Sequence, residues 1–81
     1  MAKEMDRVIG IALRNARRKR GLTQKEVAEA LHTTQTFVSK IETGKRSLRA
    51  AEAAMYNIGL GTTFRQFYNE IHAALKDIGF V

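Results

Sequence analysis

Two helix-start signals stand close together in the first half of the chain, and they limit the fold more than any other feature. Thr23-Gln24-Lys25-Glu26 has the capping-box pattern, in which the Thr23 hydroxyl accepts from the Glu26 amide and Glu26 reaches back. A second N-cap residue, Thr34, follows eleven residues later. The space between them fits one short helix and a turn of three or four residues, so the sequence predicts two short helices joined by a tight turn.

The remainder of the chain also favours helices. It contains no proline, no alternating strand pattern and no Asn-Gly hairpin signal. Its 81 residues fit one domain. We therefore predict an all-α, compact five-helix domain over residues 1–81, with four core helices in residues 6–60 and a C-terminal helix over 63–78.

The first helix is predicted to run from about Asp6, its N-cap, to Arg20, with Gly21 as the stop. Its apolar stripe consists of Ile9, Ala12, Leu13 and Ala16. The short second helix buries Val27, Ala28 and Leu31.

The third helix is predicted from Thr34 to Thr43-Gly44, with Val38 and Ile41 pointing inward. The fourth is predicted to be capped by Ser47 and to end at Gly61. Its expected apolar residues are Leu48, Ala51, Met55 and Ile58.

The C-terminal helix begins at Thr63 and carries a long apolar stripe with helical spacing. The stripe consists of Phe64, Phe67, Tyr68, Ile71, Ala74, Leu75 and Ile78. Its first part, around Phe64 and Phe67, is expected to complete the core.

The basic residues are concentrated in one part of the chain. The net charge is +6; residues 14–49 hold ten basic and three acidic side chains, a net +7, and the rest carries −1. Such a distribution is typical of a surface that binds a polyanion, although a solvated face that keeps the protein soluble has the same composition.

The outward face of the third helix is polar and contains no acid. With Val38 and Ile41 inside, the helical period turns Thr36, Ser39, Lys40 and Thr43 outward, with Gln35 at the edge of this face. Side chains of these types can donate to base edges: Gln binds adenine, Lys binds guanine, and a Thr methyl contacts thymine. Phosphate contacts are expected to flank them, at Gln24 and at Lys45, Arg46 and Arg49.

The run from Ile9 to about Phe67 resembles the Cro/repressor-type (XRE) helix-turn-helix family. The matching elements are Ile9-Gly10, Leu13-Arg14, Arg17, Gly21-Leu22-Thr23-Gln24, Val27-Ala28, Leu31, Thr33-Thr34-Gln35, Val38-Ser39-Lys40-Ile41-Glu42 and Gly44-Lys45-Arg46. The match covers about three quarters of the chain.

The resemblance implies a sequence-specific regulator of transcription that binds double-stranded DNA. In the family, the residues matching Gln35, Thr36, Ser39 and Lys40 face the bases, and those matching Gln24, Thr43, Lys45 and Arg46 hold phosphates. The residues matching Arg17 and Glu42 form a structural ion pair. The chain departs from the family pattern at His32, where many relatives have glycine, and at Thr43, where many have asparagine.

The far part of the C-terminal helix suggests a homodimer. Its apolar stripe extends beyond what the core needs and continues into Phe80 and Val81. The expected dimer interface consists of Phe67, Tyr68, Ile71, Leu75 and Ile78. A twofold dimer would place two reading helices on one palindromic operator, as in small prophage regulators or restriction–modification controller proteins. Two alternatives remain: the helix folds back on its own core, or it holds a partner protein, as in an antitoxin.

Other functions have less support in the sequence. The chain has no cysteine, no phosphate-cradling glycine loop and no nucleophile motif, and His32 and His72 lie far apart. We therefore expect no enzyme activity, metal, cofactor or small-molecule effector. RNA binding is disfavoured because most aromatics lie on the C-terminal stripe. No signal peptide or membrane span is recognisable, so we expect a cytoplasmic protein.

Overall fold

The computed structural model describes residues 2–80, and every regular element in that range is an α-helix. The helices are α1 (Ala2–Lys19), α2 (Gln24–Ala30), α3 (Gln35–Glu42), α4 (Ala50–Leu60) and α5 (Phe64–Asp77). The predicted all-α, five-helix fold is therefore confirmed.

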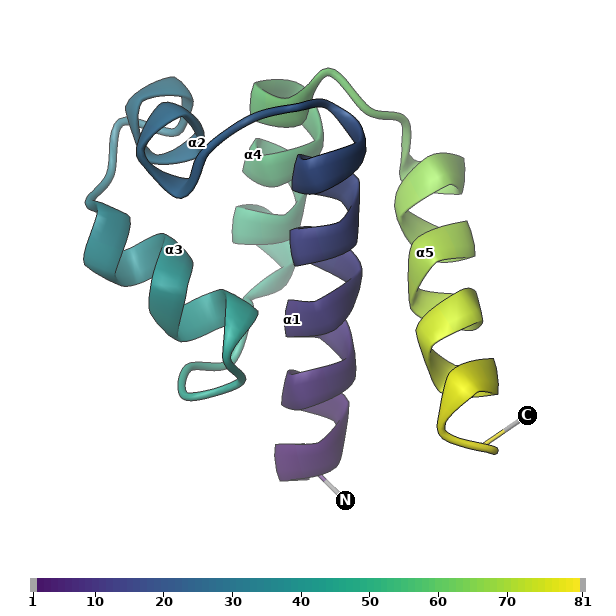
Figure 1. Ribbon diagram of the computed structural model, residues 1–81. Helices are drawn as coiled ribbons and strands as arrows, with labels where there is room; N and C mark the ends of the chain where they lie inside the picture. Colours follow the sequence, from purple (N-terminus) through teal and green to yellow (C-terminus); the bar gives the residue numbers. More distant parts are fainter. Residues whose placement is uncertain (1, 81) are drawn as a thin grey trace.

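Helix α1 stands in the middle of the arrangement. It packs against α3 on one side and along α5 on the other, whereas α2 packs against both α3 and α4 (Figure 1). Gly10 lets α1 and the end of α3 meet closely, because a Cβ at this position would lie 2.4 Å from the backbone oxygen of Ile41. The α2–α3 pair and α5 consequently lie on opposite sides of α1.

The core fills the space between the helices. Its largest fully buried side chains come from four of them: Leu13 from α1, Val27 from α2, Val38 and Ile41 from α3, and Tyr56 from α4. Burying an aliphatic side chain of this size contributes roughly 1.5–3 kcal/mol. The inward placement predicted for α1, α2 and α3 is confirmed.

The predicted starts of α1 and α4 are wrong. Helix α1 begins at Ala2, ahead of Asp6, and Glu4 in its first turn is well placed for the helix dipole. The carboxylate of Asp6 accepts a hydrogen bond of 2.6 Å from the Ser47 hydroxyl. Because Ser47 is used in this contact, it does not cap α4, which begins at Ala50.

The inward face predicted for α4 is also largely wrong. Met55 is 50% exposed and Ile58 is 82% exposed, whereas Tyr56 and Leu60 are buried. The helix is apolar on nearly all sides, so the spacing of its apolar residues defines no unique face. The large Tyr56 ring takes the interior instead. The predicted end at Gly61 is confirmed by its left-handed backbone, with φ of +66°.

Helix α5 has one buried side and one exposed apolar edge. It begins after Thr63 as predicted, and Phe67 and Ala74 are buried. Phe64, which was expected in the core, is 72% exposed because it lies at the edge of the stripe. Phe67 packs in the core of its own chain, so its assignment to a dimer interface was wrong. Val81 lies outside the described residues.

Candidate nucleic-acid interface

Both members of the α2–α3 pair begin with a side-chain cap. The Thr23 hydroxyl accepts from the Glu26 amide at 3.1 Å, and the Glu26 carboxylate accepts from the Thr23 N–H at 2.9 Å. The hydrogen bond from the Thr23 backbone N–H to the carboxylate, followed by the Thr23 side chain, lowers the pKa of Glu26. The Thr34 hydroxyl accepts from the Phe37 amide at 3.1 Å. The two predicted caps are thus confirmed, and they fix where each helix starts.

The turn between α2 and α3 needs a left-handed residue. His32 has a φ of +55°, the only positive value at a non-glycine position among residues 2–80. Such a conformation costs an L-residue roughly 1–2 kcal/mol relative to glycine. The resemblance implies that many relatives have glycine at this position, and the left-handed backbone explains that preference.

The orientation of α3 follows from its two most buried side chains. Val38 and Ile41 are 0% and 1% exposed. The helix therefore presents its opposite side to solvent, where Gln35, Thr36 and Lys40 are exposed and Ser39 is half-buried. The four predicted base-contacting residues thus share one outward face.

A shallow hollow lies over this face. It is lined by Gln24, Gln35, Thr36, Ser39, Lys40, Thr43 and Lys45. Every one of these residues was predicted from the sequence to contact bases or phosphates. The hollow contains no acidic side chain, and its two lysines give it a positive charge. It is therefore suited to a polyanion that offers acceptor groups.

Gln24 is tied to the interior by a buried ion pair. Arg17 Nε donates to Glu42 Oε2 at 2.7 Å, Arg17 Nη2 donates to Oε1 at 3.0 Å, and Gln24 Nε2 donates to the same Oε1 at 3.1 Å. Only 3% of the Glu42 side chain is exposed. The hydrogen bonds to Glu42 raise the pKa of Arg17. Arg17 makes one further hydrogen bond, from Nη1 to the Leu22 backbone oxygen at 2.8 Å, which joins the α1–α2 loop to the ion pair.

The loop after α3 carries the basic residues predicted to hold phosphates. Lys45 and Arg49 are exposed. The Thr43 hydroxyl donates its one proton to the Ser39 oxygen at 2.8 Å, so a hydrogen bond from Thr43 to a phosphate oxygen requires that proton to turn away from Ser39. Among the described residues no salt bridge engages Lys45 or Arg49, so both cationic heads can contact a phosphate.

Arg46 is held differently from its neighbours. Its Nη1 and Nη2 donate to the two Glu52 carboxylate oxygens at 2.7 and 2.9 Å, and its guanidinium lies 4.7 Å from the centre of the Phe37 ring. The paired guanidinium lowers the pKa of Glu52, and the carboxylate raises that of Arg46. Sequence reasoning missed these partners, because Glu52 lies beyond a loop and no helical spacing links it to Arg46.

Neither histidine belongs to a metal-binding group. Within residues 2–80, no cluster of three or more His, Asp or Glu side chains has the arrangement of a metal site. His32 is in the turn, and His72 is exposed on α5, with its ring 6.3 Å from that of Tyr68.

A helix-turn-helix family model matches residues 13–67, which include α2, α3, the turn between them and the core of the domain. The chain belongs to the XRE-type helix-turn-helix family. It is accordingly a DNA-binding transcriptional regulator, and its family and fold are those of such regulators rather than of enzymes.

Among solved structures, the XRE-type chain is similar to the clp gene regulator ClgR from C. glutamicum. The two are 25% identical, the match covers 88% of this chain and 92% of that one, and the TM-score is 0.82. No curated protein sequence matches the chain. None of the helices described in residues 2–80 is both long and apolar enough to cross a membrane.

Proposed function

We propose that this XRE-type regulator is a homodimer that reads a palindromic operator, with α3 of each copy in the major groove. The observation that carries the proposal is the hollow over α3. It is lined by seven residues that the sequence predicts to contact DNA, and none of the seven is acidic. In helix-turn-helix proteins the second helix of the pair enters the major groove. Here α3 is the second helix, and its polar face is uncovered.

The base contacts are assigned to Gln35, Thr36, Ser39 and Lys40. Gln35, in the first turn of α3, has the amide that can bind adenine N6 and N7, and Lys40 has the cation that can donate to guanine O6 and N7. Thr36 and Ser39 are short and permit close approach of the helix to the groove. Each good contact of this kind discriminates between bases by about 1–3 kcal/mol.

The phosphate contacts are assigned to Gln24, Thr43, Lys45, Arg46 and Arg49. Gln24 uses one N–H of its amide on Glu42, so the other remains for a phosphate oxygen. Arg46 uses three N–H groups on Glu52 and Ser47, so it would contact DNA with its remaining donors while holding the loop. Lys45 and Arg49 are the freer cations of the set.

The dimer interface is assigned to the exposed edge of α5, now without Phe67. Tyr68 and Ile78 are 58% and 57% exposed, and Ile71 and Leu75 are half-buried between them. Phe64, at 72% exposed, extends the same edge. Because α5 lies across α1 from α3, pairing through this edge leaves both copies of α3 uncovered (Figure 1).

Selection of bound sequences from a random duplex pool tests the proposal as a whole. We expect an enriched motif with twofold symmetry, whose half-sites are about 34 Å, or one helical turn, apart. A single unpaired half-site would contradict the dimer and leave α3 as the reader. A pool without enrichment, under salt conditions where the protein still binds DNA, would overturn sequence-specific reading.

A further inference from the structure

A second hollow adjoins the one over α3. It lies between the first turns of α1 and the α3–α4 loop, and Lys3, Arg7 and Lys45 are its basic lining residues. Thr43 and Lys45 line both hollows, so the two form one continuous surface. Neither Lys3 nor Arg7 belongs to the helix-turn-helix pair.

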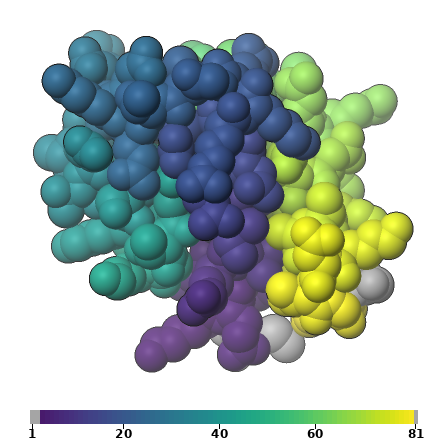
Figure 2. All heavy atoms as spheres, viewed as in Figure 1, coloured from purple at the N-terminus to yellow at the C-terminus, as the bar shows by residue number. Residues whose placement is uncertain are grey.

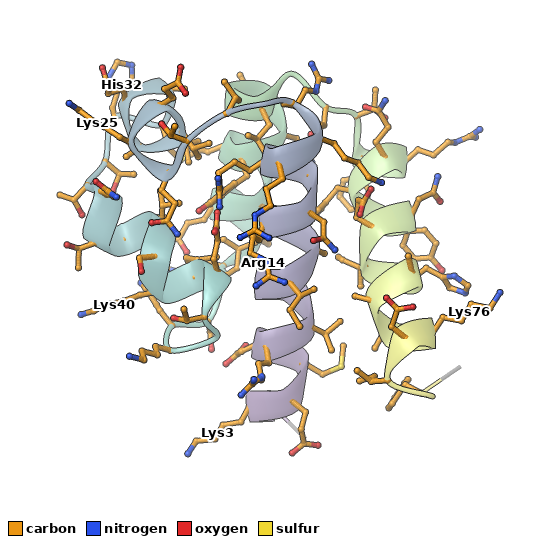
Figure 3. All side chains as sticks on the ribbon, in the orientation of Figure 1. Lys3, Arg14, Lys25, His32, Lys40 and Lys76 are labelled. Atoms are coloured by element: carbon orange, nitrogen blue, oxygen red, sulfur yellow. The ribbon has the colours of Figure 1, made fainter. Side chains whose placement is uncertain are left out.

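The early start of α1 creates this surface. Because the helix begins at Ala2, Lys3 and Arg7 are one turn apart on the same face, and both are exposed. A helix starting at Asp6 would leave Lys3 outside any regular element. Figure 3 shows Lys3 at the lower end of α1 and Lys40 on α3, which lies above and to the left of it. In Figure 2 the purple start of α1 lies beside and below the teal end of α3.

Two contacts fix the loop against α1. Gly44 has a φ of +74°, and a Cβ built on it would lie 2.9 Å from the Cα of Arg7, so the loop backbone lies directly on that residue. The Ser47 hydroxyl binds the Asp6 carboxylate at 2.6 Å. The backbone at Lys45 is therefore held beside Arg7, and the three cations come from backbone positions that are fixed relative to one another.

The chemistry of the hollow fits a phosphodiester backbone. Its lining holds three cations and one acid, Asp6, whose carboxylate is already hydrogen-bonded to Ser47. The remaining lining residues are Thr43, Gly44 and Ser47, which are small and polar. None of its lining residues has an aromatic or a purely aliphatic side chain that would stack on a base or pack against a protein. A row of cations that continues a DNA-binding face is suited to the next phosphates along the strand.

We propose that Lys3 and Arg7 bind backbone phosphates of the operator next to the phosphate contacted by Lys45. This inference rests on the proposed function and extends the DNA-binding surface beyond the helix-turn-helix unit onto α1. The contact carries no base information; it adds affinity and fixes the register of the domain on the duplex.

The test is a Lys3→Gln/Arg7→Gln variant of the full chain. Glutamine retains helix propensity and the carbons that pack near Gly44 while removing the charge. The matched control is Arg65→Gln/Lys76→Gln, which removes the same charge from exposed positions on α5; Lys76 is far from α3 in Figure 3. Thermal unfolding of each variant verifies that it is folded.

The readout is the dependence of affinity on salt for a selected duplex and for a shuffled one. Each lost phosphate contact lowers the slope of log K against log salt by about 0.9, so the α1 variant should lose roughly 2 units of slope for each copy, or roughly 4 for the bound dimer. Its affinity should fall by the same factor on both duplexes. Ethylation of the phosphates beside the Lys45 contact should inhibit binding of the parent and not of this variant.

A slope and an ethylation pattern equal to those of the control would overturn the inference. That result would leave the proposed function intact, provided that the parent still prefers its selected duplex. A parent without any such preference would instead contradict the proposed function.

Discussion

Arg17 in α1 and Glu42 at the end of α3 form a two-point ion pair, with contacts of 2.7 and 3.0 Å. Glu42 also accepts a hydrogen bond from Gln24 at the start of α2, so one buried carboxylate joins three helices. One of its two donor residues, Gln24, also lines the hollow over α3. The pair consequently determines how α2 and α3 sit relative to α1.

Removing the carboxylate should destabilise the domain strongly. Glu42→Ala removes the partner of Arg17, and only 11% of the Arg17 side chain is exposed. Breaking a buried pair in this way lowers the free energy of unfolding by about 3–5 kcal/mol. Urea unfolding measures the loss. Glu29→Ala, which removes an exposed glutamate from α2, is the control and should change stability by less than about 0.5 kcal/mol. Equal losses in the two variants would contradict the structural role of the pair.

Glycine at position 32 should stabilise the protein. The left-handed backbone of His32 lowers the free energy of unfolding by roughly 1–2 kcal/mol, and glycine would remove this strain. Glycine also loses more entropy on folding, which offsets roughly 0.5–1 kcal/mol of the gain. We expect His32→Gly to raise the free energy of unfolding by about 0.5–1 kcal/mol. Glu29→Gly, within the helical part of α2, should lower it by a similar amount. A loss of stability in both variants would mean that the His32 side chain makes a contribution of its own.

The Arg46–Glu52 pair should be visible in an acid titration. Arg46 and the Arg49 N–H both bind the Glu52 carboxylate, so its pKa is lowered from the ordinary 4.5. Because the folded-state pKa of Glu52 is lowered, the pair stabilises the fold at pH values above the ordinary pKa. This contribution disappears as the pH falls through the folded-state pKa.

Carbon NMR of the side-chain carboxyl measures this effect. In Arg46→Gln the pKa of Glu52 should rise toward 4.5, while that of Glu26, lowered by its cap bonds to Thr23, should not move. The same variant should bind the selected and the shuffled duplex with lower affinity, by a similar factor for both. An unchanged Glu52 titration would show that the pair does not form in solution.

A charge on the exposed edge of α5 should break the dimer. Ile78, which directly follows α5, and Ile58 on α4 are both exposed isoleucines, at 57% and 82%. Sedimentation of Ile78→Asp should give the mass of a monomer, whereas Ile58→Asp on α4 should keep the dimer mass. The reverse pattern would move the interface to α4. A parent that is already monomeric would favour the alternative that α5 binds another protein.

Local signals in the sequence predicted much of the fold. The caps at Thr23, Thr34 and Thr63 depend on side chains within three residues of each helix start, and all three are present. The outward face of α3 followed from Val38 and Ile41 alone. Each of these predictions needed only neighbouring residues or one helical period.

The errors arose where the outcome depends on distant contacts. Ser47 was predicted to cap α4, but its hydroxyl binds Asp6 in α1. The buried face of α4 could not be predicted because its alanines make nearly every side apolar. The bond between Arg46 and Glu52 spans a loop whose course no local pattern defines. The sequence placed the start of α1 at Asp6 and not at Ala2, so it did not indicate that Lys3 and Arg7 lie on one face of the same helix.

The central claim is that the outward face of α3 reads base sequence, and the preference ratio of Gln35→Ala tests it most directly. The ratio compares affinity for the selected duplex with affinity for a shuffled duplex at one salt concentration. For the parent it should be about 10³ or more. In the variant, loss of one base contact in each half-site should lower this ratio by a factor that corresponds to about 1–3 kcal/mol per half-site, with little change in affinity for the shuffled duplex. A variant that weakens both duplexes alike and keeps the parental ratio would contradict the claim.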